Sequence, residues 1–265
     1  MAMSLRGLKK VRNTDPPRIM LYGPPGQGKT TLASEFPSPV FLQTELGTPA
    51  GKELDSFGLI DTYDDLRAHI GTLFNDEHDF KTVVVDTIDR LEPLVWNATC
   101  KANGWDSIEG PGYGKGYVMA DIYWRDLLDG LNALRLDRGM AVVLIGHSHV
   151  TRFDDPQTVS YDRYDLRVHK RALGILQDEM DAILLVKEDP SIKMEDAGFN
   201  KKRAHAEGGG LRWIFTEGRP AFVAKNRYDM PSKLQFKRDK GFEALAPYFP
   251  GGPAVEPAED VAEAA

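Results

Sequence analysis

The run Gly23-Pro24-Pro25-Gly26-Gln27-Gly28-Lys29-Thr30 matches the pattern G-x-x-x-x-G-K-[ST] at every constrained position. It follows an apolar run at 19–22 and precedes a helix-like run that ends before Pro37, which is the context in which this pattern binds phosphate. The glycines let backbone N–H groups surround phosphate oxygens, Lys29 would reach the β- and γ-phosphates, and the Thr30 hydroxyl would bind Mg²⁺. A glycine turn with an incidental lysine is the alternative. The predicted nucleotide-binding residues are Gly23, Pro24, Pro25, Gly26, Gln27, Gly28, Lys29, Thr30 and Thr31.

Outward from this motif, short β-rich runs alternate with longer amphipathic stretches. The β-rich runs lie at 19–22, 40–43, 82–85, 141–145 and 182–186. Apolar residues recur at helical spacing between them, at Leu66, Ile70, Leu73 and Phe74 and again at Ile122, Leu127, Leu128, Leu131 and Leu134. This alternation predicts an α/β fold with a mainly parallel central sheet flanked by helices. Two further runs, at 211–216 and 221–224, predict antiparallel strands at the C-terminal edge of the sheet.

The composition is that of an ordinary folded protein, with 42 % hydrophobic and 28 % charged residues, which excludes the disordered and collagen-like classes. A membrane span needs about 18 consecutive apolar residues, and no run approaches that length. No signal peptide is evident, so we expect a cytoplasmic protein with no membrane partner, in the host cytoplasm if it is viral. The single cysteine, Cys100, excludes an internal disulfide.

The chain divides into three expected segments. Residues 1–17 form a short basic N-terminal arm, 18–247 form an ATPase core, and 248–265 form an acidic tail that we expect to be disordered. The formal net charge is −7, and four of the 40 acids lie at 251–265, where there is no base. The rest of the chain is therefore nearly neutral, which argues against coating of nucleic acid by bulk charge alone.

Two acids follow predicted strands and are candidates for chemistry on a phosphate. Asp86 ends the apolar run at 82–85, where an acid can hold the shell of a bound magnesium ion. Its alternative role is to cap the next helix, and Asp89 is interpreted as a residue of that helix's first turn rather than as a second ligand. Glu45 follows the second strand, where it could orient or activate water, although an exposed loop glutamate is also common.

Three further residues complete the predicted catalytic set of Lys29, Glu45, Asp86, His147, Lys225 and Arg227. His147 ends the fourth strand, where it could sense the γ-phosphate or merely cap the sheet. Lys225 and Arg227 are two residues apart, so a strand would place both on one side. They could stabilise phosphate charge in the ATP site of a neighbouring subunit, or protect a solvated edge strand.

The order of these elements resembles the RecA-like ATPase core: a phosphate loop, a glutamate after strand two, an acid after strand three, a polar residue after strand four, then Lys-x-Arg. The small size and the Ala-Lys-Asn-Arg-Tyr segment at 224–228 are similar to the core-only RecA-like proteins of bacteriophages, which are single-strand annealing ATPases. The resemblance covers about 18–236. It implies that Glu45 activates water, that His147 relays the nucleotide state to DNA, and that Lys225 and Arg227 act across a subunit interface. His147 departs from the glutamine usual at the relay position.

The resemblance also implies two DNA-binding loops, one after the helix that follows Asp86 and one after His147. The intervals 103–117 and 149–170 are loop-like and mix cations with aromatics, which is the mixture that tracks phosphates and stacks on bases. Packing of the aromatics on the core is the alternative. The predicted DNA-binding residues are Tyr113, Lys115, Tyr117, Arg152, Phe153, Arg163, Tyr164, Arg167 and Lys170. A third cluster, Lys201, Lys202 and Arg203, is interpreted as a solvated hairpin tip.

The leading hypothesis is therefore an ATP- and Mg²⁺-dependent oligomer, a ring or filament, that binds single-stranded DNA and promotes annealing or homologous recombination. One alternative is a small helicase-like translocase using the same residues. Another is a nucleotide-gated adaptor whose acidic tail binds a single-strand binding protein or a polymerase. A small-molecule kinase shares the phosphate loop, but no lid of several arginines can be located.

Overall fold

The computed structural model describes residue 10 and residues 13–155, 157–188, 191–196, 202–207 and 211–253, with 191–196 and 202–207 described by their backbone alone. No helix within these residues is both long enough and apolar enough to cross a bilayer.

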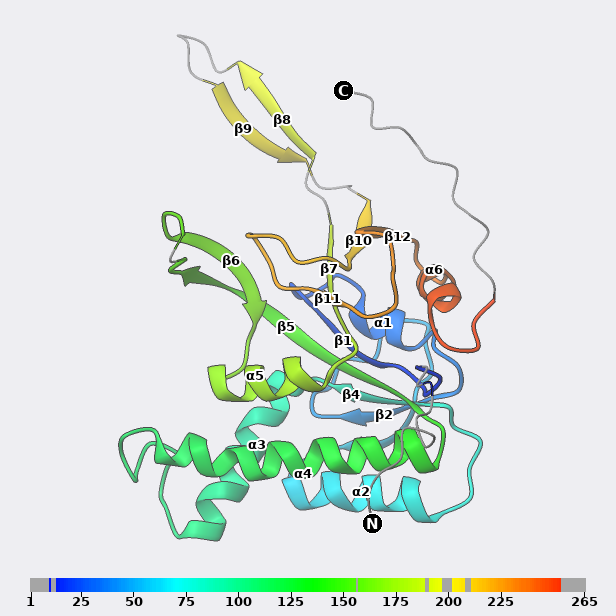
Figure 1. Ribbon diagram of the computed structural model, residues 1–265, viewed down its shortest axis with the longest axis vertical. Coiled ribbons are helices and arrows are strands. Elements are labelled where there is room, and N and C mark those ends of the chain that lie inside the picture. Colours follow the sequence, from blue (N-terminus) through cyan, green and yellow to red (C-terminus); the bar gives the residue numbers. More distant parts are fainter. Residues whose placement is uncertain are drawn as a thin grey trace.

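A ten-stranded sheet forms the centre of the described chain (Figure 1). Its strands are β1 (Arg18–Gly23), β2 (Pro39–Gln43), β3 (Asp55–Leu59), β4 (Thr82–Asp86), β5 (Ala141–Phe153), β6 (Tyr161–Leu166), β7 (Ala182–Glu188), β10 (Arg212–Phe215), β11 (Lys225–Asn226) and β12 (Lys233–Phe236). The order across the sheet is β12-β10-β7-β1-β5-β4-β2-β3, with β11 paired to β7 and β6 paired to β5. The six neighbouring strands β7, β1, β5, β4, β2 and β3 run parallel to one another. Strands β6, β10, β11 and β12 each pair antiparallel with their neighbours. A separate hairpin pairs β8 (Ser191–Asp196) with β9 (Lys202–Glu207).

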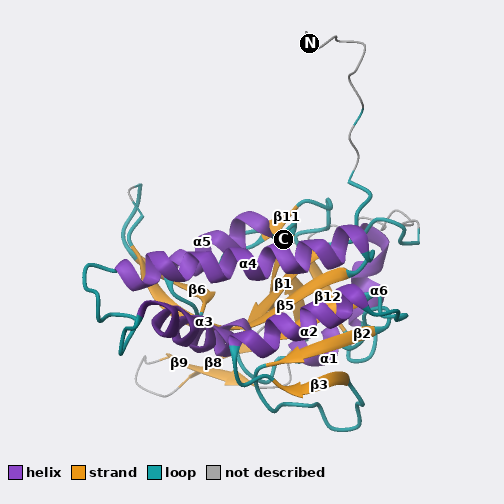
Figure 2. Cartoon of the chain, turned by 90° about the horizontal axis from the view of Figure 1, so that it is seen from below, coloured by secondary structure: helices purple, strands orange, loops and turns teal. Residues whose placement is uncertain are grey.

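Helices cover both faces of this sheet (Figure 2). The helices are α1 (Lys29–Ala33), α2 (Tyr63–Asn75), α3 (Ile88–Asn103), α4 (Lys115–Asp137), α5 (Lys170–Glu179) and α6 (Gly241–Leu245), and a 3₁₀ turn, η2, spans Ala246–Tyr248. Apolar side chains of α2, α3, α4 and α5 pack on one face, and those of α1 and α6 pack on the other. The strands between them are buried on both sides, which explains why they are continuously apolar rather than alternating.

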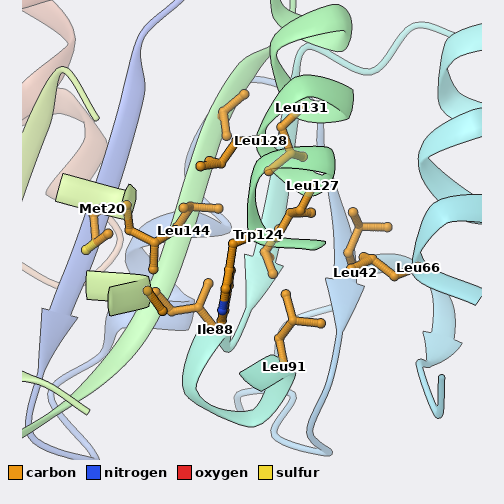
Figure 3. Packing of buried hydrophobic residues seen from close by; sticks show 14 of the residues in the cluster. Met20, Leu42, Leu66, Ile88, Leu91, Trp124, Leu127, Leu128, Leu131 and Leu144 are labelled. Atoms are coloured by element: carbon orange, nitrogen blue, oxygen red, sulfur yellow. The ribbon is translucent and has the colours of Figure 1, made fainter. Parts of the chain in front are cut away.

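Strand β1 shows how the two faces are filled. Met20 and Tyr22 point into the larger cluster, under the four long helices, while Ile19 and Leu21 point into the smaller one. In the larger cluster Trp124 of α4, which is 1 % exposed, lies among side chains from the strands and neighbouring helices (Figure 3). The phosphate loop therefore begins at the end of a strand that is fixed by packing on both faces.

The predicted fold class is confirmed: the sheet is mainly parallel, helices flank it, and antiparallel strands form its C-terminal edge. The five predicted parallel strands are all present, and the run at 211–216 contains β10. The strand predicted at 221–224 is wrong, because the pairing segment is Lys225–Asn226. The edge strand β3 was not predicted, since its residues are exposed and follow no apolar pattern.

Strand β5 is longer than the sequence suggested, and this corrects a prediction. Beyond its pairing with β4 and β1, which ends at His147, it continues to Phe153 and pairs with β6, from Ser148 opposite Leu166 to Phe153 opposite Tyr161. The interval 149–170 was expected to be a loop and is instead largely a projecting β-hairpin, here called the β5–β6 arm (Figure 1). Its strands have β-branched and aromatic residues, which favour pairing.

Both ends of the predicted core need adjustment. The Arg135 guanidinium donates to the Pro16 carbonyl oxygen at 2.6 Å, so the packed chain begins within the predicted N-terminal arm. Phe249 is buried against Phe36 and Tyr228, so packed structure also extends past 247. Residues 1–9 and 11–12 of the predicted N-terminal arm and residues 254–265 of the predicted acidic tail lie outside the described residues. Lys201 of the third basic cluster also lies outside them.

Candidate functional site

A cavity of about 350 Å³ lies where β1, β4 and β5 end at the same edge of the sheet. The carboxyl ends of parallel strands are where open α/β sheets bind ligands. The predicted site residues that line the cavity are Gly26, Gly28, Lys29, Thr30, Thr31, Glu45, Asp86 and His147. Sequence reasoning therefore assembled most of one site from residues that are more than 100 positions apart.

The loop from Gly23 to Gly28 depends on glycine for its backbone path. Gly23, Gly26 and Gly28 have φ angles of +156°, +76° and +84°, a region that other residues rarely adopt. A Cβ on Gly23 would also lie 2.1 Å from the carbonyl oxygen of Val186 in β7. The Gln27 side chain accepts a hydrogen bond from a backbone N–H of β7 at 2.7 Å. Strand β7 therefore lies close against the loop at Gly23 and is hydrogen-bonded to it at Gln27.

Lys29 extends back along this loop. Its Nζ donates hydrogen bonds to the carbonyl oxygens of Gly23, at 3.0 Å, and Pro24, at 2.9 Å. An ammonium group has three N–H bonds, so one remains for a ligand in the cavity. Burial lowers the pKa of Lys29 to about 8, although the carboxylate of Asp86 opposes this shift. A phosphate beside Lys29 would favour its charged form.

Thr30 and Asp86 form the pair that the sequence assigned to magnesium. The Thr30 hydroxyl donates to Asp86 Oδ2 at 2.9 Å. Asp86 Oδ1 is buried and has no hydrogen-bond partner among the described residues, so it is available to a ligand in the cavity. Magnesium is usually held by one or two carboxylates together with substrate phosphates, and one hydroxyl beside one carboxylate fits that donor set. Within the described chain there is no cluster of three or more His, Cys, Asp or Glu side chains that could hold a metal ion without phosphate.

Burial raises the pKa of Asp86 to about 6, against the hydrogen bond from Thr30, which lowers it. The nearby charge of Glu45 adds to the rise. The site therefore disfavours two ionised carboxylates unless a cation lies between them.

Replacing Asp86 with asparagine is expected to stabilise the nucleotide-free protein at pH 8 by about 1 to 3 kcal/mol. With the pKa raised to about 6, Asp86 stays protonated in the folded chain at pH values where it is already ionised in the unfolded chain. The wild-type free energy of unfolding should consequently fall as the pH rises from about 4 to about 6, and the variant should lack this component. Urea denaturation of both proteins at pH 4, 6 and 8 measures the difference. Equal stability of the two proteins at pH 8 would contradict the buried, unpartnered carboxylate.

Hydrogen bonds between the ends of β2 and β4 place Glu45 in the cavity. The preceding residue, Thr44, donates its backbone N–H to the Asp86 carbonyl oxygen at 2.8 Å and its hydroxyl to the Thr87 carbonyl oxygen at 2.7 Å. The Glu45 carboxylate lies 3.5 Å from the Nε of Arg90 in α3. An acid in this position faces the same space as Lys29 and Asp86, as the interpretation of Glu45 as a water-activating base requires.

His147 lines the cavity but is also held from behind by Asp89. The His147 backbone N–H donates to Asp89 Oδ1 at 3.0 Å, and its Nδ1 lies 3.2 Å from both carboxylate oxygens. Arg167, at the base of the β5–β6 arm, donates to the same carboxylate at 2.6 Å. Although burial opposes it, these hydrogen bonds hold the pKa of Asp89 well below its usual range. Asp89 was interpreted as a helix first-turn residue, and the structure shows it joining the site to the arm.

Lys225 and Arg227 do not reach this cavity. Lys225 Nζ donates to the carbonyl oxygens of Gln177, at 2.7 Å, and Asp178, at 3.1 Å, near the end of α5. Arg227 forms an ion pair of 3.2 Å with Asp181. Their strand pairs with the first residues of β7, whereas the phosphate loop lies beside its later residues. Strand β11 ends at Asn226, so Arg227 lies just beyond the strand that was predicted to carry both cations, and neither cation lines the nucleotide cavity of its own chain.

The predicted DNA-binding residues of the second interval lie on or beside the β5–β6 arm. The Arg163 guanidinium lies 4.0 Å above the Phe153 ring, and the exposed Arg152 forms, among the described residues, a 3.9 Å ion pair with Asp162. The Tyr164 ring lies under the ammonium group of Lys187 at 4.6 Å. The last two cations are at the end of the interval: Arg167, already described, and Lys170 at the first position of α5.

The first interval is shorter than predicted, because α4 begins at Lys115. Tyr113 is fully exposed before the helix. Tyr117 is not available for base stacking in this conformation: its ring stacks on His169 at 3.9 Å and its hydroxyl donates to Glu109 at 2.9 Å. The packing alternative therefore describes Tyr117 better than the base-stacking one.

Two arginines line the cavity that the sequence analysis did not single out. Arg212 opens β10 and Arg238 follows β12. Neither lies in a recognisable motif, and each is about 200 residues from the phosphate loop. Only the pairing of β10 with β7 and of β12 with β10 brings them to the site.

Residues 15–228, more than half of the chain, match the family described as AAA domain (AAA_24). This chain belongs to the AAA domain family. The AAA domain is thus a P-loop NTPase, a class that binds ATP with Mg²⁺ and hydrolyses it.

Comparison with curated proteins found no match to this AAA domain. Among solved structures it is similar to the crystal structure of the RadB recombinase, with 17 % sequence identity, a TM-score of 0.48, and coverage of 85 % of this chain and 90 % of that chain. Its α/β fold has a mostly parallel sheet and antiparallel C-terminal strands, as the sequence predicted. The resemblance to the RecA-like ATPase core stays a prediction. The narrower resemblance to single-strand annealing proteins of bacteriophages stays a prediction.

Proposed function

We propose that this AAA domain is an ATP-dependent single-stranded DNA binding protein that promotes annealing or homologous recombination, and that it hydrolyses Mg-ATP at interfaces between its own copies. The observation that carries the proposal is the continuity of β5, which supplies His147 to the nucleotide cavity and then forms the β5–β6 arm. A change in the position of His147 would move the base of the arm directly.

The contacts of Asp89 support such coupling. Its buried carboxylate accepts hydrogen bonds from His147, in the cavity, and from Arg167, at the end of the arm. The Arg167 backbone N–H donates in turn to the His147 carbonyl oxygen at 2.9 Å. A nucleotide that shifts His147 would therefore change the contacts of Arg167 as well, giving a switch whose two ends share one carboxylate.

The arm has the chemistry of a single-strand binding surface. Arg152 is exposed on β5, and Phe153 presents a ring with the Arg163 guanidinium above it. Single strands are bound by cations that follow phosphates and by aromatic or guanidinium planes that stack on bases. Tyr113, exposed at the other predicted interval, would add a second stacking group.

Hydrolysis requires each of the cavity residues to act in a defined way. Mg²⁺, when bound, would neutralise phosphate charge beside Thr30 and Asp86. Lys29 binds phosphate oxygens with its remaining N–H, and Glu45 takes the proton of the attacking water. Lys225 and Arg227, which do not reach the site of their own chain, are proposed to complete the site of a neighbouring copy in a ring or filament. We further propose a cytoplasmic location and that the acidic tail binds a single-strand binding protein or a polymerase.

The test of DNA binding compares Arg152→Ala with Arg67→Ala. Arg152 lies on the arm and Arg67 on α2, both are exposed, and each has one exposed ion pair. The affinity for an oligothymidylate is measured at several salt concentrations, and log affinity is plotted against log salt concentration. Because Arg152→Ala removes one phosphate contact, the magnitude of the negative slope should fall by about 0.7. Arg67→Ala should leave the slope unchanged. The wild-type ATP turnover should rise when the same oligonucleotide is added.

Equal salt slopes for the two variants, together with turnover that does not respond to single-stranded DNA, would overturn the DNA-binding part of the proposal. A strand-displacement assay tests the translocase alternative. If the protein separates the strands of a forked duplex when no complementary strand is added, the translocase alternative is favoured.

A further inference from the structure

Two cations from the C-terminal edge of the sheet share the cavity with the phosphate loop. Arg212 lies at the start of β10, and Arg238 lies in the turn between β12 and α6. Both belong to the same chain as Lys29, in contrast to Lys225 and Arg227, which do not line the cavity of their own chain. Their presence in the cavity needs an explanation of its own.

Arg212 lies directly against the backbone of the phosphate loop. A Cβ built on Gly28 would be 3.1 Å from Arg212 Nη1 and 3.2 Å from Cε1 of Phe236. Glycine at this position therefore leaves space that the guanidinium and the ring occupy from the outside. In P-loops the backbone N–H groups at this part of the turn surround the α- and β-phosphates.

The edge that carries the two arginines is fastened to the site at two other places. The backbone N–H groups of Gly241 and Phe242 donate to the Glu35 carboxylate, just past α1, at 2.6 and 3.0 Å. Asp239, next to Arg238, forms a 2.7 Å ion pair with Lys52, in the segment that follows Glu45. The arginines are thus held over the cavity by contacts that do not use their own side chains.

The charge of the cavity also calls for further cations. Lys29 is the single cation that the P-loop motif supplies to the cavity. Asp86 Oδ1 is buried and unpartnered beside it, and Glu45 adds a second carboxylate. A guanidinium stays charged at all relevant pH values and can donate two parallel N–H bonds to a phosphate.

We propose that Arg212, assisted by Arg238, binds the α- and β-phosphates of the nucleotide from within the same chain. This inference rests on the proposed function, because it assumes that the cavity binds ATP. It adds a second set of phosphate ligands, supplied by the antiparallel edge of the sheet rather than by the P-loop. Because the contact is to the phosphates that ATP and ADP share, Arg212 acts as a binding residue in both nucleotide states.

The experiment is calorimetric titration of the full chain with ATP and with ADP, each with Mg²⁺. Arg212→Ala should weaken the affinity for both nucleotides by a similar factor, about 10- to 100-fold, which is the range for a lost hydrogen bond to a charged group. Arg238→Ala, an exposed residue outside the strands, should weaken both by a smaller factor and cannot disturb β-sheet pairing. Arg219→Ala is the matched control, because Arg219 is exposed beyond β10 and does not line the cavity.

The outcomes separate this inference from the function on which it rests. If Lys29→Ala binds ATP as tightly as the wild type, the nucleotide site itself is wrong. If Lys29→Ala loses affinity but Arg212→Ala and Arg238→Ala both behave like Arg219→Ala, only the present inference is overturned. A loss confined to ATP would also overturn it, because that pattern indicates a γ-phosphate contact.

Discussion

Replacing Lys29 with alanine is expected to lower kcat/KM for ATP by about 10³-fold, the upper range for loss of one preorganised electrostatic donor. The expectation follows from its geometry: Nζ is buried, two of its three N–H bonds are held by the Gly23 and Pro24 carbonyl oxygens, and the third is free to meet phosphate. Alanine removes this donor and leaves the two carbonyl oxygens facing the cavity without a partner. Steady-state phosphate release measures the effect.

Lys101→Ala is the control, since Lys101 is an exposed cation at the far end of α3. A Lys29→Ala protein that retains more than about a tenth of wild-type turnover would contradict the assigned site.

The Lys29→Ala variant also tests the proposed interface between copies. Lys225→Ala should also be inactive, and a mixture of the two inactive proteins should regain part of the turnover, because one mixed interface would combine an intact P-loop with an intact Lys225.

Replacing Glu45 with glutamine is expected to lower kcat by about 10²- to 10⁴-fold with little change in the affinity for ATP. The amide has the shape of the carboxylate but cannot accept the proton of water, so only the chemical step should suffer. Thr44, locked to Thr87 and Asp86, keeps the backbone at this point in place in the variant. Single-turnover hydrolysis together with ATP titration separates the two effects.

Glu77→Gln provides the comparison for Glu45→Gln, because Glu77 is exposed after α2 and outside the cavity. If Glu45→Gln hydrolysed ATP at the wild-type rate, Glu45 would not be the base, and its ion pair with Arg90 would be its structural role. A fall in ATP affinity of the same size as the fall in kcat would instead assign Glu45 to binding.

The sequence predicted those parts of the site that lie next to a strand end. The P-loop, Glu45, Asp86 and His147 each follow a run of apolar residues, and the rule that parallel strands bind ligands at their carboxyl ends is enough to bring them together. The same reasoning placed Asp89 in the first turn of a helix, where it does lie, but it could not show that His147 and Arg167 share its carboxylate.

The β5–β6 arm shows where pattern alone was insufficient. Its residues are polar and aromatic rather than apolar, so the segment at 149–170 has the composition of a loop. It becomes a hairpin because β5 is already extended by its pairing in the sheet and the chain returns to pair with it. The sequence likewise could not decide whether the Tyr117 ring stacks on a base or packs within the protein. The fold decides this, because it places the His169 ring against that of Tyr117.

The sequence by itself determined that a phosphate loop begins at the end of a buried strand and that a helix and sheet alternate around it, because glycine freedom and apolar periodicity are local properties. Only the tertiary structure decided which cations reach the cavity. Arg212 and Arg238 arrive in the cavity through antiparallel pairing at the sheet edge, whereas Lys225 and Arg227 are directed to the other end of β7. Pairing between strands distant in the sequence is set by the packing of the whole sheet, and no local pattern of residues records it.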